Sequence, residues 1–381
     1  MQSSPSASSL SGQAIRSSYI PGLDGIRAVA FTLVFLAHAT PGRISTYVPA
    51  TLGVTIFFFL SGYLITTLLR AEILRTGTIS LRDFYIRRTL RIFVPLYIAF
   101  SIAAILSRFV LHIDPGNRLG VLAMLFYFYN YAIALHWAAV VPMGLTVIWS
   151  LAVEEHFYLL FPLGYLALVR KGCSPARQTR ILVFCCLGAL IWRAAILALL
   201  QPHNWTYVTT DCRFDSILWG SILAIRNNPR FADPPLLPAH RRFPAFLFGL
   251  ALIVLTLLVR PPLFRETLRY TLQALSLYLI FSFILTEISH PTVRWLEWRA
   301  VRYIGWISYS LYLVHVFILA ALRIYVPDRL WLTSSLGLGI AILYGTVLRY
   351  TVELPLQTLR ARFRHVPEAD PTAADAHGLI S

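Results

Sequence analysis

Residues 48–69 read VPATLGVTIFFFLSGYLITTLL, a run of 22 residues without a charged side chain. A helix needs about 20 predominantly apolar residues to cross the hydrocarbon core of a bilayer, so this run predicts a transmembrane helix. The composition agrees, because 57% of the 381 residues are hydrophobic and only 13% are charged. A soluble core does not absorb so much apolar sequence. We therefore predict an all-α, polytopic helical bundle with the lipid bilayer as its solvent.

Nine further apolar runs have about the length of a membrane span, although the run at 211–225 is short. They cover residues 20–40, 91–111, 147–169, 181–200, 211–225, 243–259, 268–288, 303–325 and 331–350. We therefore expect ten transmembrane helices within one membrane domain at residues 19–360. The polar residues 1–18 predict a disordered cytoplasmic tail, and residues 361–381 predict a second polar cytoplasmic tail.

Basic residues between the runs predict the orientation, because loops rich in Arg and Lys remain on the cytoplasmic side. All the later basic loops share the side of residues 70–91 only if residues 119–140 do not cross the membrane. We therefore expect 119–140 to be a re-entrant or outer-surface segment and both termini to be cytoplasmic. The same loops account for the net charge of +16, so the charge does not indicate nucleic-acid binding.

Ionisable residues inside predicted spans mark function by default, because charge is costly in a membrane. Arg27 and His38 are 11 residues apart in the first span. That is about three helical turns, which predicts one shared helix face and a separation of about 16 Å. The structural alternatives are an arginine that anchors the topology and a histidine satisfied at the interface.

A carboxylate pair, Glu154 and Glu155, lies in the fourth span and is followed by His156. Adjacent helical residues point about 100° apart, so we expect that the two carboxylates do not both face one cavity squarely. The alternative is a polar network that only packs helices together. The four cysteines of the chain show no metal-binding spacing, and we predict no metal site.

Two further clusters are predicted near the outer side. Arg213 and Asp215 form an Arg/Asp pair at the mouth of the sixth span, for which an ordinary loop ion pair is the alternative. Tyr309 and His315 belong to a Ser/Tyr/His-rich stretch, for which hydrogen bonding between helices is the alternative.

The basic stretch before the third span holds Arg87, Arg88 and Arg91. Arg87 and Arg91 are four residues apart, so they stack on one side of a helix. The stretch is explained either by topology alone or by a cytoplasmic clamp for phosphate groups.

In this order the motifs resemble those of the membrane acyltransferase-3 family, bacterial O-acyltransferases of O-antigens, exopolysaccharides, peptidoglycan and some macrolides. The resemblance covers about residues 19–360, with His156 standing where many members carry Gln. It rests on the motifs Leu23–Arg27 with His38, Phe57–Ile65, Phe84–Tyr97, Ser150–Tyr158, Arg213–Asp215 and Ser308–His315. Many members also carry an esterase-like domain after the membrane part, which we do not expect here.

The resemblance implies a bacterial inner-membrane enzyme with ten or eleven helices and an acyl-CoA donor, usually acetyl-CoA. It maps the family's Arg-to-His motif onto Arg27 and His38, and its acidic motif onto Glu154 and Glu155. The acceptor implied is a hydroxyl of a carbohydrate, a glycolipid or a small molecule in the cell envelope.

On this basis we expect the arginines at 87, 88 and 91 to hold the phosphates of acyl-CoA, with Arg27 at the mouth of the pore. His38 is expected to act as general base, and Glu155, beside Glu154, to orient a catalytic group or balance the imidazolium charge. The expected oxyanion or sugar ligands are Arg213, Asp215, Tyr309 and His315. Direct transfer and an acyl relay, with Ser61 as one candidate, both stay open.

The rival interpretation is a transporter or flippase for a lipid-linked glycan or a small molecule, which also needs buried charges around a cavity. We find no internal repeat of the kind that many transporters carry.

Overall fold

The computed structural model describes residues 19–40, 48–112, 118–137, 145–200, 205–326 and 329–363. Regular structure in these ranges is helical throughout, which confirms the all-α prediction. The predicted tail at 1–18 and residues 364–381 lie outside the described residues.

Each of the ten predicted spans coincides with a long helix. These helices are α1 (Leu23–Ala39), α2 (Ala50–Thr76), α3 (Leu81–Phe109), α6 (Ile148–Arg170), α7 (Pro175–Leu200), α9 (Thr210–Arg226), α10 (Ala239–Leu258), α12 (Leu268–Thr286), α13 (Arg299–Tyr325) and α14 (Leu330–Leu348). Among the described residues, eight helical segments are long and apolar enough to cross a membrane. The remaining two, α1 and α9, have 17 residues each, and the count of ten spans stays a prediction.

Short elements connect the long helices. They are α4 (Arg118–Leu125), α5 (Tyr129–Ala134), η3 (Leu145–Val147), α8 (Trp205–Val208), η4 (Pro229–Phe231), α11 (Pro262–Glu266), η5 (Arg294–Glu297), η6 (Arg349–Glu353) and α15 (Leu354–Ala361). The segment predicted not to cross, 119–140, forms α4 and α5 over its described part. Helices of eight and six residues are too short to span a bilayer. The assignment of this segment as re-entrant or surface-bound stays a prediction.

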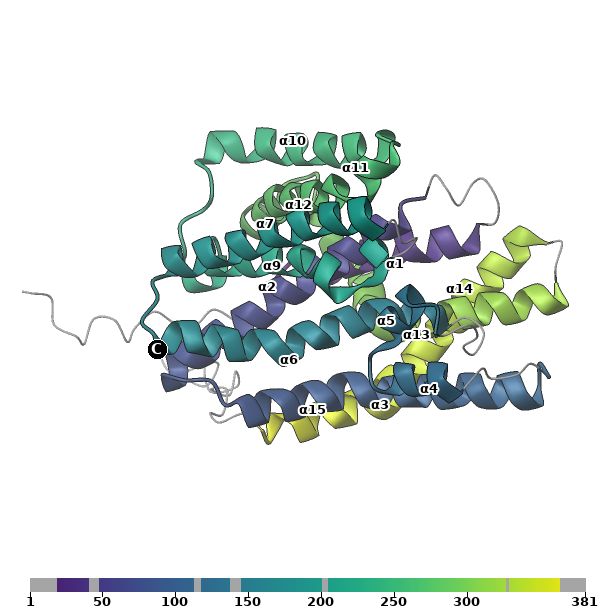
Figure 1. Ribbon diagram of the computed structural model, residues 1–381. Helices are drawn as coiled ribbons and strands as arrows, with labels where there is room; N and C mark the ends of the chain where they lie inside the picture. The colour runs from purple at the N-terminus through teal and green to yellow at the C-terminus, as the bar shows by residue number, and fades with distance from the viewer. Residues whose placement is uncertain are drawn as a thin grey trace, which may run out of the picture.

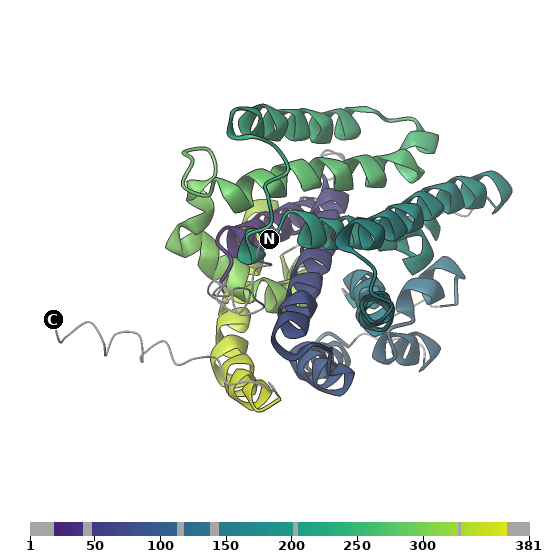
Figure 2. The same cartoon turned by 90° about the vertical axis from the view of Figure 1, so that its left-hand side faces the viewer.

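The helices are arranged in layers, which Figure 1 shows in order from α10 at one face to α3 and α15 at the other. Helix α10 packs on α12, and α9 packs on both α7 and α2. Helix α1 lies between α2 and α13, and α13 also carries α14. The view in Figure 2, turned by 90°, shows α3 and α15 together along the edge opposite α10. Helices α1, α2, α3, α6 and α13 therefore surround the interior of the bundle.

The contact between α2 and α9 requires glycine on both sides. A Cβ added at Gly62 would lie 1.8 Å from the carbonyl oxygen of Ile217, and one added at Gly220 would lie 2.0 Å from that of Phe59. Small residues let helix backbones approach closely in membranes, where van der Waals packing replaces the hydrophobic effect. This crossing fixes α2, which carries the Phe57–Ile65 motif into the interior.

Several helices are longer than the apolar runs that predicted them. Helix α3 begins at Leu81, ten residues before the predicted span, because Ser80 caps its N-terminus by accepting from the Asp83 backbone N–H. The arginines at 87, 88 and 91 therefore lie within a helix. Beyond α14, the π-helical turn η6 and α15 continue to Ala361.

We predict that Gly62→Ala lowers the stability of the folded protein by about 1–3 kcal/mol, because the added methyl group overpacks the backbone contact with α9. Thermal unfolding of the detergent-solubilised protein measures the change. Gly164→Ala in α6 is the matched control, since nothing lies within 4 Å of a Cβ added there. A Gly62→Ala protein as stable as the Gly164→Ala protein would contradict the close crossing.

Candidate active site

A large cavity of about 480 Å³ lies where α1 and α3 begin and α2 ends. Residues of η6 and α15 close its far wall. Its charged lining comprises eight arginines and three carboxylates, namely Arg27, Arg75, Arg87, Arg88, Arg91, Arg230, Arg349, Arg360, Asp24, Glu72 and Glu353. We call it the arginine cavity. It lies at the membrane face that the basic loops predict to be cytoplasmic.

Each carboxylate of the arginine cavity already has an arginine partner. Arg27 contacts Asp24 at 2.6 Å, and Arg87 contacts Glu72 at 3.0 Å. Glu353 accepts from Arg349 at 3.1 Å, within the π-helical turn, and also from the Ser310 hydroxyl at 2.6 Å. The arginines outnumber the carboxylates by five, so the cavity carries a large excess of positive charge that favours a polyanionic ligand.

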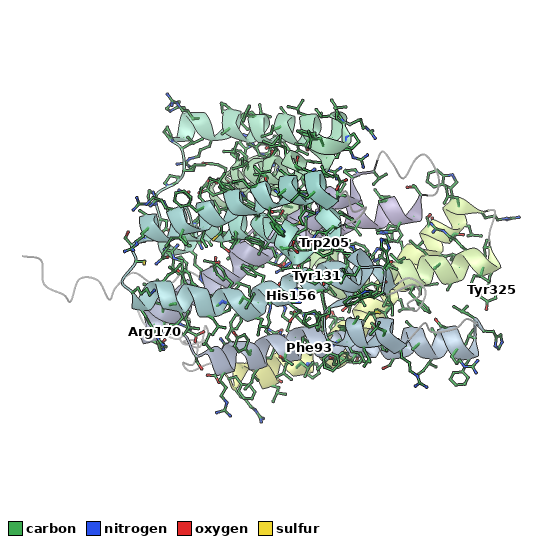
Figure 3. The ribbon with its side chains drawn as sticks, viewed as in Figure 1. Phe93, Tyr131, His156, Arg170, Trp205 and Tyr325 are labelled. Atoms are coloured by element: carbon green, nitrogen blue, oxygen red, sulfur yellow. The ribbon has the colours of Figure 1, made fainter. Side chains whose placement is uncertain are left out.

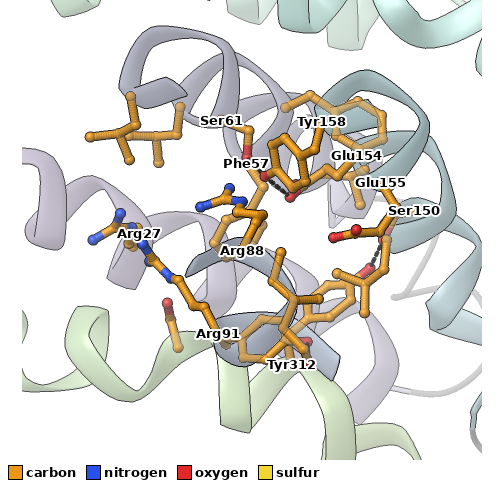
Figure 4. Close-up of a pocket in the computed structure, with 18 residues that line it drawn as sticks. Arg27, Phe57, Ser61, Arg88, Arg91, Ser150, Glu154, Glu155, Tyr158 and Tyr312 are labelled. Atoms are coloured by element: carbon orange, nitrogen blue, oxygen red, sulfur yellow. Dashed lines mark hydrogen bonds between the residues drawn. The ribbon is translucent and has the colours of Figure 1, made fainter. Parts of the chain in front are cut away.

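A smaller cavity of about 100 Å³ adjoins the first, and Arg27, Arg88 and Arg91 line both. Figure 4 shows it between α2, α3, α6 and α13. Its other polar lining residues are Ser61, Ser150, Glu154, Glu155, Tyr158, Ser308, Tyr309 and Tyr312. We call it the inner cavity. The structure thus brings together three of the predicted arginines, both glutamates and Tyr309, although they come from four distant parts of the sequence.

The Tyr158 hydroxyl links a carboxylate and a second hydroxyl in the lining of the inner cavity. The Tyr158 hydroxyl lies 2.6 Å from Glu154 Oε2 and 2.9 Å from Ser61 Oγ. The guanidinium of Arg88 lies 3.8 Å from the centre of the Tyr158 ring, which is a cation–π contact. Glu154 therefore orients Tyr158, and Arg88 fixes the ring from its face.

Glu154 and Glu155 both line the inner cavity, and the expectation that they do not both face it squarely stays a prediction. Figure 4 shows both glutamates on α6 at the wall of this cavity. The Oε1 atom of Glu155 is buried without a hydrogen-bond partner in the described part of the chain. A buried carboxylate oxygen in this state is costly and is ready to accept a hydrogen bond from a ligand.

The two histidines predicted for the outer half meet each other, outside the residues that line the two cavities. His315 is fully buried, His38 is half-buried, and His315 Nε2 lies 3.3 Å from His38 Nδ1. The connection to the inner cavity runs through Tyr312, whose ring centre lies 5.6 Å from that of His315. Glu155 is not among the contacts of His38. His315, and not Glu155, lies beside the His38 ring.

The predicted Arg213–Asp215 pair is wrong. Asp215 binds Arg193 of α7 at 2.8 Å, with both side chains fully buried, and also accepts from Thr271 at 3.0 Å. Arg213 stacks on the Tyr270 ring at 3.9 Å. Neither Arg213 nor Asp215 lines the inner or the arginine cavity. Their proposed part in substrate binding therefore has no support from the geometry.

Arg193, which forms the buried ion pair with Asp215, was missed in the sequence analysis. It lies inside the apolar run at 181–200, so the rule that singles out ionisable residues within spans identifies it as well. His156 turns away from the inner cavity, and its Nδ1 lies 2.6 Å from Thr210 Oγ1. Figure 3 shows it with Tyr131 and Trp205: the Tyr131 ring packs against His156, and the Trp205 ring packs against Tyr131.

Comparison with known proteins matches the profile of an acyltransferase domain to residues 20–350. A peptidoglycan O-acetyltransferase of Listeria monocytogenes is 29% identical over 318 residues, which is 78% of this chain and 49% of that protein. A Staphylococcus aureus protein, provisionally named as an O-acetyltransferase, is 30% identical over 334 residues, which is 81% of this chain and 52% of that protein.

A Bacillus subtilis protein, provisionally named as a peptidoglycan O-acetyltransferase, is 28% identical over 310 residues, which is 78% of this chain and 48% of that protein. The chain therefore spans about half the length of the curated relatives it matches. No solved structure matches the chain.

We predict that Asp215→Leu destabilises the protein by about 3–5 kcal/mol, because it leaves Arg193 buried without its carboxylate. Replacing both partners, as in Asp215→Leu with Arg193→Met, should recover most of that stability. The measurement is thermal unfolding of the single and double variants in one detergent. If Asp215→Leu keeps wild-type stability and loses activity, Asp215 belongs to the substrate site after all.

Proposed function

The chain belongs to the acyltransferase family whose profile covers residues 20–350, and from this premise we propose that it is an integral membrane O-acetyltransferase. The donor is acetyl-CoA from the cytoplasm, and the acceptor is a carbohydrate hydroxyl at the outer side of the membrane. The observation that carries this proposal is the arginine cavity, which narrows into the inner cavity within the bundle.

The donor's charge matches the arginine cavity. Coenzyme A carries three phosphate groups, and arginine holds phosphate with a planar fork of N–H donors. Arg88 and Arg91 line both cavities and form no ion pair with a carboxylate in the described ranges, so their charge is available to phosphate. Arg87, which also contacts Glu72, and Arg27 complete the expected set at the mouth of the inner cavity.

The pantetheine arm of the donor is neutral. It fits the inner cavity, whose lining has fewer arginines and more hydroxyl groups than that of the arginine cavity. It spans roughly 16 Å when extended, counted from standard bond lengths. The arm would pass the Glu155 carboxylate, whose free oxygen suits an amide N–H, and the hydroxyls of Tyr309 and Tyr312. The thioester would then lie near Tyr312, at the outer end of the inner cavity.

His38 is the proposed general base for the acceptor hydroxyl, since a neutral imidazole accepts a proton in the useful pH range. Its ring centre is 5.1 Å from that of His315, which in turn is 5.6 Å from that of Tyr312. The acetyl group on a thioester near Tyr312 would therefore have to pass the Tyr312 ring to meet an acceptor hydroxyl at His38.

The acceptor is proposed from the names of the relatives, two of which name peptidoglycan. A sugar hydroxyl suits a site with a neutral base near the outer side and a donor held from the inner side. A soluble muramyl disaccharide from peptidoglycan is the first acceptor to test, and a panel of other glycosides is the second.

The test of the function uses inside-out membrane vesicles that contain the protein, with radiolabelled acetyl-CoA added outside and muramyl disaccharide enclosed. Acetyl-CoA does not cross the membrane, so label on the enclosed sugar establishes both the transfer and its direction. His38→Ala at equal abundance should lose the transfer, by about 100-fold or more. If the wild type labels neither this sugar nor any glycoside of the panel, the result contradicts the proposed transfer and favours the transporter interpretation.

We predict that Arg91→Ala raises the KM for acetyl-CoA by about 10- to 100-fold, since it removes a charge-assisted contact to phosphate. The sharper measurement compares acetyl-CoA with acetyl-pantetheine, which lacks the phosphates. The variant and the wild type should use acetyl-pantetheine equally well. Arg180→Ala, an exposed position at the start of α7, is the matched control. An equal loss with both donors would show that Arg91 does not serve the phosphates.

A further inference from the structure

The pair of histidines at the outer end of the bundle has a definite arrangement of protons. His315 Nδ1 lies 2.9 Å from the backbone carbonyl oxygen of Tyr312. A carbonyl oxygen only accepts, so this nitrogen carries a proton. His315 is fully buried, and a charged imidazolium there would be costly. Its ring is therefore neutral, and its Nε2 is a bare hydrogen-bond acceptor.

The same reasoning applies to His38. Its Nδ1 lies 2.8 Å from the carbonyl oxygen of Val34, one turn earlier in α1, and so this nitrogen also carries a proton. The unprotonated Nε2 of His315 lies 3.3 Å from His38 Nδ1 and accepts a second hydrogen bond from the same N–H group. Within the described residues, the Nε2 atom of His38 has no hydrogen-bond partner. His38 is half-buried, and in the proposed reaction this Nε2 atom would meet the acceptor hydroxyl.

We propose that His315 is the positioning residue for His38, holding its ring so that Nδ1 keeps the proton and Nε2 stays bare as the base. This inference rests on the proposed function, in which His38 removes the acceptor's proton. In the best-known catalytic triad a buried carboxylate orients the histidine in this way. Here a neutral imidazole does so, and no second charge has to be buried in the membrane.

The surroundings of His315 fix its ring. The Phe31 ring meets it edge-on at 5.8 Å with an interplanar angle of 86°, and the Phe35 ring lies 6.4 Å away. Tyr312 packs against another side. Arg323 approaches His38 only at its backbone carbonyl oxygen, where it donates a hydrogen bond. The orientation of His315 is thus set by packing on α1 and α13, and its acceptor atom is aimed at His38.

Two substitutions separate this role from simple packing. In His315→Gln, Oε1 stands the same number of bonds from Cβ as the imidazole Nε2, so an acceptor for His38 remains. His315→Leu keeps a side chain of similar size in the apolar surroundings but offers no acceptor. A residue that only fills space would tolerate Leu at least as well as Gln.

The kinetic test measures acetyl transfer from acetyl-CoA to muramyl disaccharide by the full-length protein in lipid vesicles. We expect His315→Leu to lower kcat by about 100-fold with little change in the KM for acetyl-CoA, because only the base is misplaced. His315→Gln should retain kcat within about tenfold of the wild type. His290→Leu, in the loop after α12, is the matched control. A fully active Leu variant, or a Gln variant as poor as Leu, overturns the proposal.

The second measurement does not depend on the acceptor. Solid-state ¹⁵N NMR of histidine-labelled protein in lipid, with His38 assigned from its loss in His38→Gln, reports which ring nitrogen carries the proton. We expect a single form with Nδ1 protonated in the wild type, and a mixture of forms in His315→Leu, where the ring is free to turn away from the Val34 carbonyl. Protonation at Nε2 in the wild type, or an unchanged single form in the Leu variant, overturns the inference. If the wild type shows the expected form but transfers no acetyl group, the proposed function fails and the histidine geometry stands.

Discussion

Helices α2 and α9 touch backbone to backbone, and the arrangement of the rest of the bundle depends on that contact. Any side chain at Gly62 or Gly220 would collide with a carbonyl oxygen of the facing helix. A second such approach joins α1 and α13, where a Cβ at Gly305 would lie 1.9 Å from the carbonyl oxygen of Asp24. With α1, α2, α9 and α13 held in this way, α3 and α6 have only the other side of the interior to occupy, and the two cavities form there.

Polar groups in the membrane interior are satisfied in two different ways. At Asp215 both carboxylate oxygens are paired, with Arg193 bound through two 2.8 Å contacts and Thr271 supplying another donor, although Arg193 Nε is buried without a partner in the described residues. Around the inner cavity the pairing is incomplete, and Glu155 keeps a buried oxygen without a partner. A carboxylate with both oxygens paired fits a structural role, whereas an unsatisfied carboxylate oxygen beside a cavity fits a ligand that supplies the missing partner. The geometry thus separates two clusters that look equally functional in the sequence.

The sequence predicts the helices well because the membrane imposes length and polarity on each span. It also identifies the arginines at 87, 88 and 91, since charge beside an apolar run stands out. The sequence does not show that Arg88 and Arg91 share a cavity with Glu154 and Tyr309. Residue spacing within one helix does not specify which other helix packs against it. For the same reason the sequence suggests Arg213 as the partner of Asp215, because the two residues are neighbours in the chain. The actual partner, Arg193, lies on a different helix. The η6 turn adds Arg349 and Glu353 to the lining of the arginine cavity. No local sequence pattern predicts that these two residues lie there.

The separation of the arginine cavity from the pair formed by His38 and His315 has an electrostatic explanation. The arginine cavity concentrates positive charge at one face of the membrane, and among the described residues Glu154 and Glu155 are the only charged ones that the inner cavity adds to the three arginines it shares with the arginine cavity. In the proposed reaction only the acetyl group and the neutral pantetheine arm enter the low-dielectric interior. The phosphates stay where arginine and water both stabilise them. A neutral histidine pair at the outer end then removes the acceptor's proton without a fixed charge at the membrane centre. The narrowing from about 480 Å³ to about 100 Å³ is what such a division of the donor requires.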